Sequence, residues 1–290
     1  MTRILVTGAD GQVGKELQFL ASQHPLFEFR FTDRLTLDIT DSAGVARYVE
    51  SFHPDIIINC AAYTAVDRAE SDTSGAARIN IEGSLVLASA AKTVGARMLH
   101  LSTDYVYHND WNRPLTENAP TNPQSVYAKT KLDGDLIARQ ILGDDVTVVR
   151  TSWVYSSYGH NFVKTMLTLA QERDTLNVVD DQIGSPTYAR DLAAALLTIC
   201  GQKDNWGGIY HYSNEGVCSW YDFAHAIFAE NEIDMQLSPI PSSQYPTPAV
   251  RPPFSVLNKR KIRDTFGLNI PHWRDSLIRC LQALATETTV

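Results

Sequence analysis

Cysteine is scarce in this sequence, and its distribution excludes several kinds of site. The 290 residues include only four cysteines, at positions 60, 200, 218 and 280. They form no CxxC pair and no spacing typical of metal ligands, which excludes a zinc ribbon and a dithiol redox centre. Cys60 follows an apolar run, so we expect a buried small residue there. Few, scattered cysteines favour a reducing compartment, and we expect a cytoplasmic protein.

Long apolar segments and an excess of positive charge are missing as well. No run approaches the ~18 apolar residues of a membrane span, and the N-terminus enters an apolar strand without the features of a signal peptide. Because 25 Lys and Arg face 33 Asp and Glu, the net charge is −8, and the basic footprint that nucleic acid requires is absent. We therefore expect neither a membrane nor nucleic acid as a partner, although a local basic pocket for a small anion fits this charge.

Short apolar runs alternate with helical patterns in the first half of the chain. Residues 56–58 and 146–149 are nearly continuous apolar runs, as expected for parallel strands covered on both faces. The alternation predicts an α/β fold with a doubly wound parallel (Rossmann) sheet and right-handed crossovers. We expect strands at 4–6, 27–32, 56–59, 97–101 and 146–150, and helices at 12–23, 42–52, 74–94 and 125–142.

The pattern loosens after residue 151. We expect helices at 162–173 and 189–200, a strand at 209–212 that returns to the sheet, a helix from residue 220, and a terminal helix. The chain then divides into a dinucleotide-binding part, 1–150 with 186–213, and a smaller C-terminal substrate-binding domain formed by 151–185 and 214–290. Six prolines fall between positions 239 and 253. Because this stretch also contains Tyr245 and Arg251, we favour a ligand-clasping loop over a linker.

Three glycines at three-residue spacing follow the first expected strand and open the first expected helix. Gly8 permits a tight turn, Gly11 lets the backbone approach a pyrophosphate, and Gly14 lets the helix pack closely on the strand. The helix N-terminus then offers free N–H groups to the phosphates. Glycines also collect in ordinary turns, but this strand–turn–helix context favours a dinucleotide site. Its neighbouring residues would be Asp10, Gln12 and Val13.

The end of the second expected strand bears on the choice of cofactor. Asp33 lies where an acid takes the adenosine ribose hydroxyls, which favours NADH, whereas Arg34 could pair with the 2′-phosphate of NADPH. A solvated strand-end carboxylate is the alternative for Asp33, and the choice between NADPH and NADH stays open. Further cofactor contacts are expected in the next loop and after the third strand, at Asp38, Ile39, Ala61, Ala62 and Tyr63.

A phenol and an ammonium lie four residues apart in one expected helix. Tyr127 and Lys131 share a helical face, whereas Lys129 points to a different one. A nearby ammonium stabilises a phenolate and lowers the pKa of the tyrosine, which makes it a usable general acid. Thr103, at the end of the fourth strand, can hydrogen-bond the same carbonyl oxygen. Such a pair alone is usually a solvated helix face, but together with the glycine turn it predicts catalysis.

These features resemble the extended short-chain dehydrogenase/reductase family and, within it, the dTDP-4-dehydrorhamnose reductases. The resemblance extends over nearly the whole chain and is carried by specific strings. They are NCAAYTAVDRAE at 59–70, STDYVY at 102–107, RTSWVY at 150–155, NFVKTM at 161–166, DQIGSPT at 181–187 and YPTPAVRP at 245–252.

The resemblance implies reduction of dTDP-4-dehydro-β-L-rhamnose to dTDP-β-L-rhamnose by NADPH or NADH. Tyr127 would donate the proton, Lys131 would hold the nicotinamide ribose, and Thr103 would polarise the 4-keto oxygen. Arg251 would meet the substrate diphosphate, and a planar guanidinium in a rigid loop suits that contact. The sugar site would be lined by Asp104, Tyr105 and Trp153, although core packing is an equal alternative for Trp153.

Two departures and four alternatives accompany this interpretation. The loop 108–111 lacks the Asp-Gly turn of relatives, and Ser156 replaces a common glycine, so the substrate mouth is expected to differ in shape. The absence of a glutamate after Asp104 disfavours a dehydratase. Another sugar-nucleotide reductase or epimerase, or a non-catalytic regulatory subunit of the same fold, stays open, although a scaffold has no need of all three catalytic residues.

A metal and a second subunit are suggested only by the family, which includes magnesium-linked dimers. No His, Cys, Asp or Glu cluster has ligand spacing, so we predict no metal site, and Mg²⁺ is unsupported by the sequence. A homodimer is left open.

Overall fold

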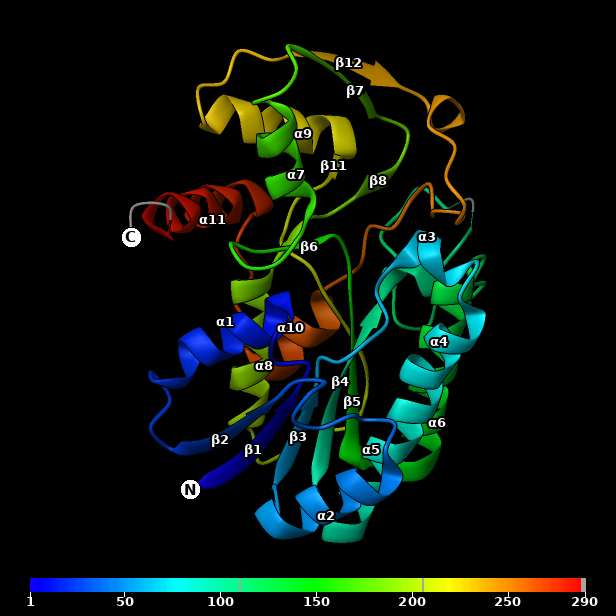
Figure 1. Cartoon of the computed structure of the whole chain (residues 1–290), viewed down its shortest axis with the longest axis vertical. Coiled ribbons are helices and arrows are strands. Elements are labelled where there is room, and N and C mark those ends of the chain that lie inside the picture. Colours follow the sequence, from blue (N-terminus) through cyan, green and yellow to red (C-terminus); the bar gives the residue numbers. More distant parts are fainter. Residues whose placement is uncertain (110, 205, 288–290) are drawn as a thin grey trace.

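The chain folds around one parallel sheet, with a smaller group of helices and short strands beyond the carboxyl ends of its strands (Figure 1). The computed structural model describes residues 1–109, 111–204 and 206–287. No helix among these residues is long and apolar enough to cross a membrane.

The central sheet has six strands in the order β10-β5-β4-β3-β1-β2, and all of its pairings are parallel. The strands that the sequence predicted as continuous apolar runs, β3 and β5, are buried along their whole length. The order reverses between β1 and β3, which creates the switch point where ligands bind in such sheets. The predicted doubly wound parallel sheet is confirmed. The strands are β1 (Thr2–Thr7), β2 (Phe27–Thr32), β3 (Ile56–Asn59), β4 (Arg97–Thr103), β5 (Val146–Thr151) and β10 (Gly208–Tyr212).

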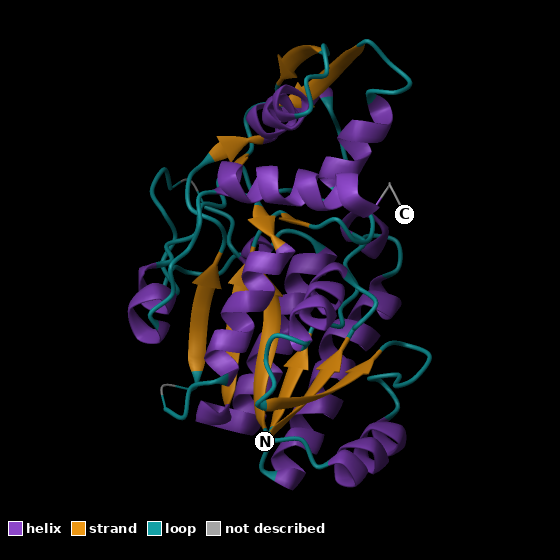
Figure 2. Cartoon of the chain, turned by 90° about the vertical axis from the view of Figure 1, so that its left-hand side faces the viewer, coloured by secondary structure: helices purple, strands orange, loops and turns teal. Residues whose placement is uncertain are grey.

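Helices cover both faces of this sheet (Figure 2). On one face, α1 (Gln12–Ala21) packs beside α8 (Ala189–Cys200), and α10 (Arg260–Phe266) packs on β10. On the other face, α5 (Gly83–Val94) packs between α2 (Ser42–Phe52) and α6 (Val126–Leu142). The Ser125 hydroxyl accepts from the Ala128 N–H at 3.2 Å and so caps α6 at the end that faces the cleft.

Several sequence-based helix boundaries differ from the structure, two of them by more than two residues. The helix expected at 74–94 is divided into α4 (Thr73–Ala77), a π-helical turn (Arg78–Glu82) and α5. The helix expected at 162–173 ends earlier, as α7 (Phe162–Leu169), and residues 170–172 form a turn. A short helix, α3 (Val66–Ala69), follows β3.

The smaller group packs around an apolar cluster shared by α7, α9 (Trp220–Glu230) and α11 (Trp273–Glu287). We had expected the whole proline-rich stretch to be a loop. Its start instead belongs to β12 (Gln236–Ile240), which pairs with β7 (Thr175–Val179). Pro239 lies within β12. An edge strand tolerates proline, because the missing N–H is not needed for pairing on its open side. Short strand pairs complete this part: β6 (Val154–Tyr155) with β9 (Thr187–Tyr188), and β8 (Ile183–Gly184) with β11 (Cys218–Ser219).

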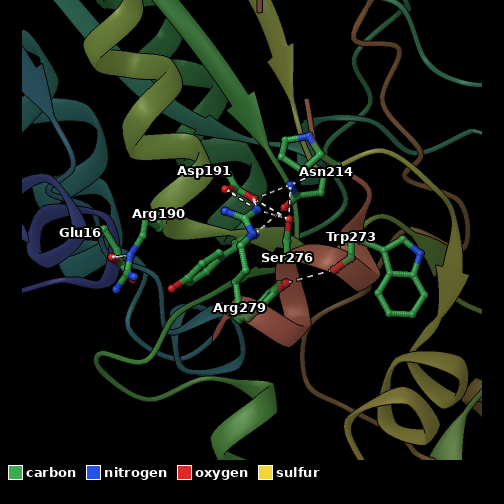
Figure 3. A network of polar contacts seen from close by, with 10 residues as sticks. Glu16, Arg190, Asp191, Asn214, Trp273, Ser276 and Arg279 are labelled. Atoms are coloured by element: carbon green, nitrogen blue, oxygen red, sulfur yellow. Dashed lines mark hydrogen bonds and ion pairs between the residues drawn. The ribbon is translucent and has the colours of Figure 1, made fainter. Parts of the chain in front are cut away.

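Polar clusters at the start of α8 hold its neighbours in place (Figure 3). The buried Asp191 carboxylate accepts from Ser276 at 2.6 Å, Asn214 at 2.8 Å and Arg279 at 2.8 Å, which ties α11 to α8. The preceding residue, Arg190, donates to Glu16 of α1 at 2.7 Å. Hydrogen bonds of this charged kind are shorter and stronger than neutral ones. The division into a dinucleotide-binding and a substrate-binding part stays a prediction.

Candidate functional site

A cleft of about 1050 Å³ lies at the carboxyl edge of the central sheet. It receives residues that follow β1, β2, β3, β4 and β5, together with the first turns of α1 and α6. This position is the one that the reversal of strand order predicts for a ligand. The cleft lining includes every cofactor residue that we predicted: Gly8, Asp10, Gly11, Gln12, Val13, Gly14, Asp33, Arg34, Asp38, Ile39, Ala61, Ala62 and Tyr63.

The glycine turn at one end of the cleft leaves no room for side chains. Gly8 has φ +69°, and a Cβ there would lie 2.6 Å from the Ala61 nitrogen. A Cβ on Gly14 would lie 2.4 Å from the Gly8 carbonyl oxygen. Gly11 is the N-cap of α1, and the first turn of this helix carries no acidic side chain. No acidic side chain of the first turn therefore competes with a ligand for the backbone N–H groups at this helix end. The glycine turn and the helix end together fit a dinucleotide diphosphate.

Acidic and basic groups meet at the end of β2. The Asp33 carboxylate accepts from the Thr36 N–H at 2.8 Å, the Thr36 hydroxyl at 2.8 Å and the Leu35 N–H at 3.0 Å. These hydrogen bonds, led by that of the Thr36 N–H, lower the pKa of Asp33, so the turn is held by a carboxylate. Arg34 lines the cleft and also a neighbouring hollow of about 510 Å³ that contains Arg47. Both a carboxylate and a guanidinium therefore face the region where we expect the adenosine ribose.

Thr103, Tyr127 and Lys131 line the same cleft at its other end. Thr103 is the last residue of β4, and Tyr127 lies in the first turn of α6. Lys131 is buried one turn further on, whereas Lys129 is exposed on another face of the helix. The Thr103 hydroxyl lies 3.2 Å from an Asp104 carboxyl oxygen.

The Tyr127 phenol keeps its proton more tightly than we expected. Burial raises the pKa of Tyr127 to about 12, and a hydrogen bond with Thr103 opposes this rise only in part. We expected the Lys131 ammonium to lower this pKa. In the structure, the Lys131 Nζ instead donates to the Leu101 carbonyl oxygen at 2.8 Å. Tyr127 is therefore a protonated phenol at neutral pH, as a proton donor must be.

Asp104 is a buried carboxyl group beside this pair. Its Oδ2 atom has no hydrogen-bond partner among the described residues. Burial raises the pKa of Asp104 to about 7, although hydrogen bonds with Ser255 and Thr103 oppose the change. The next residue, Tyr105, packs its ring edge-on against Tyr127, with 5.7 Å between centroids. Both Asp104 and Tyr105 line the cleft.

Two stacked indoles form part of the cleft wall. The Trp153 and Trp220 rings lie 3.7 Å apart at an interplanar angle of 10°. Trp153 has φ +49°, and a Cβ on Gly184 would lie 2.6 Å from its ring, so the backbone there is shaped around this side chain. Trp153 thus packs against the apolar cluster of the smaller part and also faces the cleft. The core packing that we considered for Trp153 is present, and its contact with a sugar stays a prediction.

Arg251 is the one predicted site residue outside the cleft lining of the described chain. Its guanidinium makes a two-pronged ion pair with Asp67 of α3, at 2.7 and 3.0 Å. Asp67 also accepts from the Ala249 N–H at 3.1 Å. Hydrogen bonding to Arg251 lowers the pKa of Asp67. The proline-rich stretch is thereby fastened across the molecule to the segment that follows β3.

Trp220 and Ser152 are among the cleft residues that sequence reasoning missed. Ser152 follows β5 and could have been found from the rule that ligands meet the carboxyl ends of strands. Trp220 begins a helix far along the chain, and no local pattern marks it. Further residues of this kind include Cys60, Thr64, Ser102, Thr151 and His160.

The structure bears on Ser156, on loop 108–111 and on possible metal ligands. Ser156 is buried and its hydroxyl donates to Glu16 at 2.7 Å, so it has a structural partner. Within loop 108–111, position 110 lies outside the described residues. Over residues 1–109, 111–204 and 206–287, no group of three His, Cys, Asp or Glu side chains is placed to hold a metal ion.

Comparisons with known proteins agree with this site. A family model described as the RmlD substrate binding domain matches residues 1–286. The dTDP-4-dehydrorhamnose reductase of Escherichia coli (strain K12) is 41% identical, with 99% of both chains covered. The spore coat polysaccharide biosynthesis protein SpsK of Bacillus subtilis is 40% identical, over 97% of this chain and 98% of that one.

Solved structures show the same similarity. A dTDP-4-dehydrorhamnose reductase from Clostridium acetobutylicum has a TM-score of 0.93 and 40% identity, over 98% of this chain and all of that one. The Bacillus anthracis enzyme in complex with NADP also has a TM-score of 0.93, with 37% identity and the same coverage. The resemblance found in the sequence is confirmed, and the chain belongs to the RmlD substrate binding domain family, alongside relatives named dTDP-4-dehydrorhamnose reductase.

Proposed function

We propose that the protein reduces the 4-keto group of dTDP-4-dehydro-β-L-rhamnose with NADPH or NADH to give dTDP-β-L-rhamnose. The observation that carries this proposal is a single cleft with a glycine cradle at one end and Thr103, Tyr127 and Lys131 at the other. Relatives of nearly full length bear the name of this activity, and one was solved with NADP.

The cofactor would lie between the two ends of the cleft. Its diphosphate would meet the N-terminus of α1 above Gly11, and its adenosine ribose would lie near Asp33 and Arg34. Lys131 would hold the nicotinamide ribose. When bound, the cofactor supplies a hydride to the carbonyl carbon of the sugar.

The chain itself supplies the proton. As negative charge develops on the carbonyl oxygen, Tyr127 transfers its phenolic proton to that oxygen, and the Thr103 hydroxyl donates a hydrogen bond to it. The high pKa of Tyr127, about 12, keeps the proton available until this charge develops. Thr103 is buried, and exclusion of water by the bound ligands would strengthen both interactions.

The substrate would fill the remaining space beside the catalytic residues. Asp104, Tyr105 and Trp153 would line the sugar, and Arg251 would meet the diphosphate after releasing Asp67. We also propose that the protein acts in the cytoplasm on this small molecule. Cys60, Cys200 and Cys218 are free thiols, and this fits a reducing compartment.

Replacing Tyr127 by Phe tests the proposal directly. We expect Tyr127→Phe to lower kcat at least about 100-fold, since a positioned general acid contributes on that order, while NADPH still binds. The measurement is the loss of NADPH absorbance with dTDP-4-dehydrorhamnose as substrate. Lys129→Ala, on the exposed face of the same helix, is the matched control and should keep the parent rate.

Two outcomes contradict the proposal. If Tyr127→Phe turns over the substrate at the parent rate, Tyr127 is not the proton donor. If the parent protein converts the sugar without consuming NADPH or NADH, the reaction is an epimerisation instead.

A further inference from the structure

Lys131 needs a counter-charge that Tyr127 does not supply. Lys131 is only 3% exposed, and its Nζ donates to a neutral carbonyl oxygen, that of Leu101. Burial lowers the pKa of the Lys131 ammonium, and the charge of Asp135, one helical turn further along α6, opposes this change.

Asp135 is held in place by groups from two strands. Its Oδ2 atom accepts from the Ser102 hydroxyl of β4 at 2.8 Å and from the Arg150 Nε of β5 at 3.3 Å. Its Oδ1 atom lies 3.6 Å from the His100 Nε2. The side chain is only 1% exposed, so this carboxyl group is set deep between helix and sheet.

Arg150 is a second buried cation in the same place, and it is fixed from its far side. Its Nη1 donates to the Tyr107 hydroxyl at 2.7 Å, and that hydroxyl lies 2.8 Å from the His211 Nε2. His211 in turn contacts the Leu115 carbonyl oxygen at 3.1 Å through Nδ1. Since a guanidinium does not lose its proton in proteins, Arg150 is a permanent positive charge.

The remaining titratable neighbours of Lys131 do not offset these two cations. Burial lowers the pKa of His100 far below its ordinary value, so the ring is neutral. Burial raises the pKa of Cys60 to about 12 and that of Tyr127 to about 12, so both groups keep their protons. Burial raises the pKa of Asp135 itself, and the charges of Arg150 and Lys131 oppose this rise. Asp135 is therefore the carboxyl group whose charge is coupled to both cations.

We propose that Asp135 is a positioning residue for the reduction. Its carboxylate keeps Lys131 positively charged and directed along the inner face of α6, and Arg150 and Ser102 hold Asp135 in the position that this requires. The role of Lys131 at the cofactor ribose rests on the proposed function. The electrostatic coupling between Asp135 and Lys131 does not depend on it.

The decisive variant is Asp135→Asn, which keeps the shape of the side chain and removes its charge. Its effect on Lys131 is measured by NMR of the full chain with ¹³Cε-labelled lysine, the Lys131 signal being assigned by its loss in Lys131→Met. We expect the titration midpoint of Lys131 to fall by at least about one pH unit, because a buried ammonium loses its partner beside a fixed cation. Asp135→Glu should restore most of the shift, and Ser102→Ala, which leaves the charge in place, should change the midpoint far less.

Kinetics supply the second readout. Since Lys131 loses its proton at lower pH in Asp135→Asn, the alkaline limb of the kcat profile should move to lower pH. The loss of kcat should then be larger at pH 9 than at pH 6, with the KM of the sugar little changed. A merely structural role would lower the melting temperature and leave the profile in place.

Each result decides the proposal. An unchanged Lys131 midpoint in Asp135→Asn overturns it. If that variant does not fold, the parent protein still provides a test, because titration of Lys131 below pH 7 would mean that there is no cation to maintain. If the parent does not reduce the dTDP sugar, the proposed function fails while the NMR titration still reports on the coupling.

Discussion

Asp104 lies next to Thr103 at the end of β4, with one carboxyl oxygen unpartnered among the described residues. A carboxylate in such a place is desolvated, and its protonated form is favoured. Because burial raises the pKa of Asp104 to about 7 from an unfolded value near 3.8, the folded protein binds this proton more tightly than the unfolded chain does. Folding is therefore least hindered by Asp104 at low pH, and the cost grows as pH rises from about 4 to 7.

This sign leads to a stability prediction. Asp104→Asn removes the titrating group, so its unfolding free energy relative to the parent should increase with pH. The gain should reach about 4 kcal/mol above pH 7, on the order set by the shift, and disappear near pH 4. Urea unfolding at pH 4, 6 and 8 measures it. A difference that does not change with pH would mean that Asp104 is ionised in the folded protein throughout this range.

Individual residues differed in how far the sequence could predict them. Tyr127 and Lys131 were found because helical spacing alone places them on one face, and Thr103 because it ends a strand. The direction in which the pKa of Tyr127 shifts was not predicted. We considered the nearby ammonium but not the burial of the phenol, which depends on how the whole core packs. Asp135 and Arg150 escaped notice for the same reason, since a sequence does not show which buried charges meet.

Among the elements, α1 depends strictly on a single position, Gly14. Gly14 lies where the helix meets the turn after β1, and the Gly8 carbonyl and the Ala9 backbone fill the space beside its Cα. Backbone atoms cannot rotate away as a flexible side chain can. A larger residue at position 14 must therefore move the helix N-terminus and, with it, the N–H groups that face the cleft.

We expect Gly14→Ala to destabilise the protein by roughly 1–3 kcal/mol, as overpacking does, and to weaken NADPH binding at least about tenfold. Thermal unfolding and a fluorescence titration with NADPH measure the two effects. The matched control is Gly201→Ala at the end of α8, where the nearest atom would lie at 3.4 Å. NADPH affinity equal to that of the control would show that the position of α1 does not govern the cofactor site.

Elements that follow local patterns agreed with prediction, and those set by tertiary partners did not. Strand β3 and helix α8 have the predicted bounds, because apolar runs and helical periodicity are local signals. β12 was missed, since Pro239 begins a stretch that we expected to be a loop, and its pairing partner, β7, lies far away in the chain. The π-helical turn before α5 leaves no mark in the periodicity.

At the scale of the whole molecule, the proline-rich stretch joins the two sides of the cleft. Its Arg251 pairs with Asp67 on the segment that follows β3. Both side chains are partly exposed, so the ion pair itself contributes little to stability. The Arg251–Asp67 ion pair instead holds the Arg251 guanidinium in one place before the substrate diphosphate binds.

A pair of variants separates the two tasks of Arg251. Arg251→Ala should raise the KM of the dTDP sugar and the inhibition constant of dTDP about tenfold or more, the range expected for lost charged hydrogen bonds. Asp67→Asn frees the guanidinium and should leave dTDP binding as tight as in the parent or tighter. Equal weakening in both variants would mean that Arg251 acts only by anchoring the loop.

The sixth strand of the sheet, β10, also governs the order in which the fold can be completed during synthesis. Strands β1 to β5 are contiguous in the first 151 residues, whereas β10 follows most of the segments that form the far wall of the cleft. A chain leaving the ribosome can therefore pair five strands while the buried edge of β5 still awaits its neighbour. Until residue 212 has emerged, that edge is exposed, and this interval is when the nascent protein is most open to mispairing with another strand.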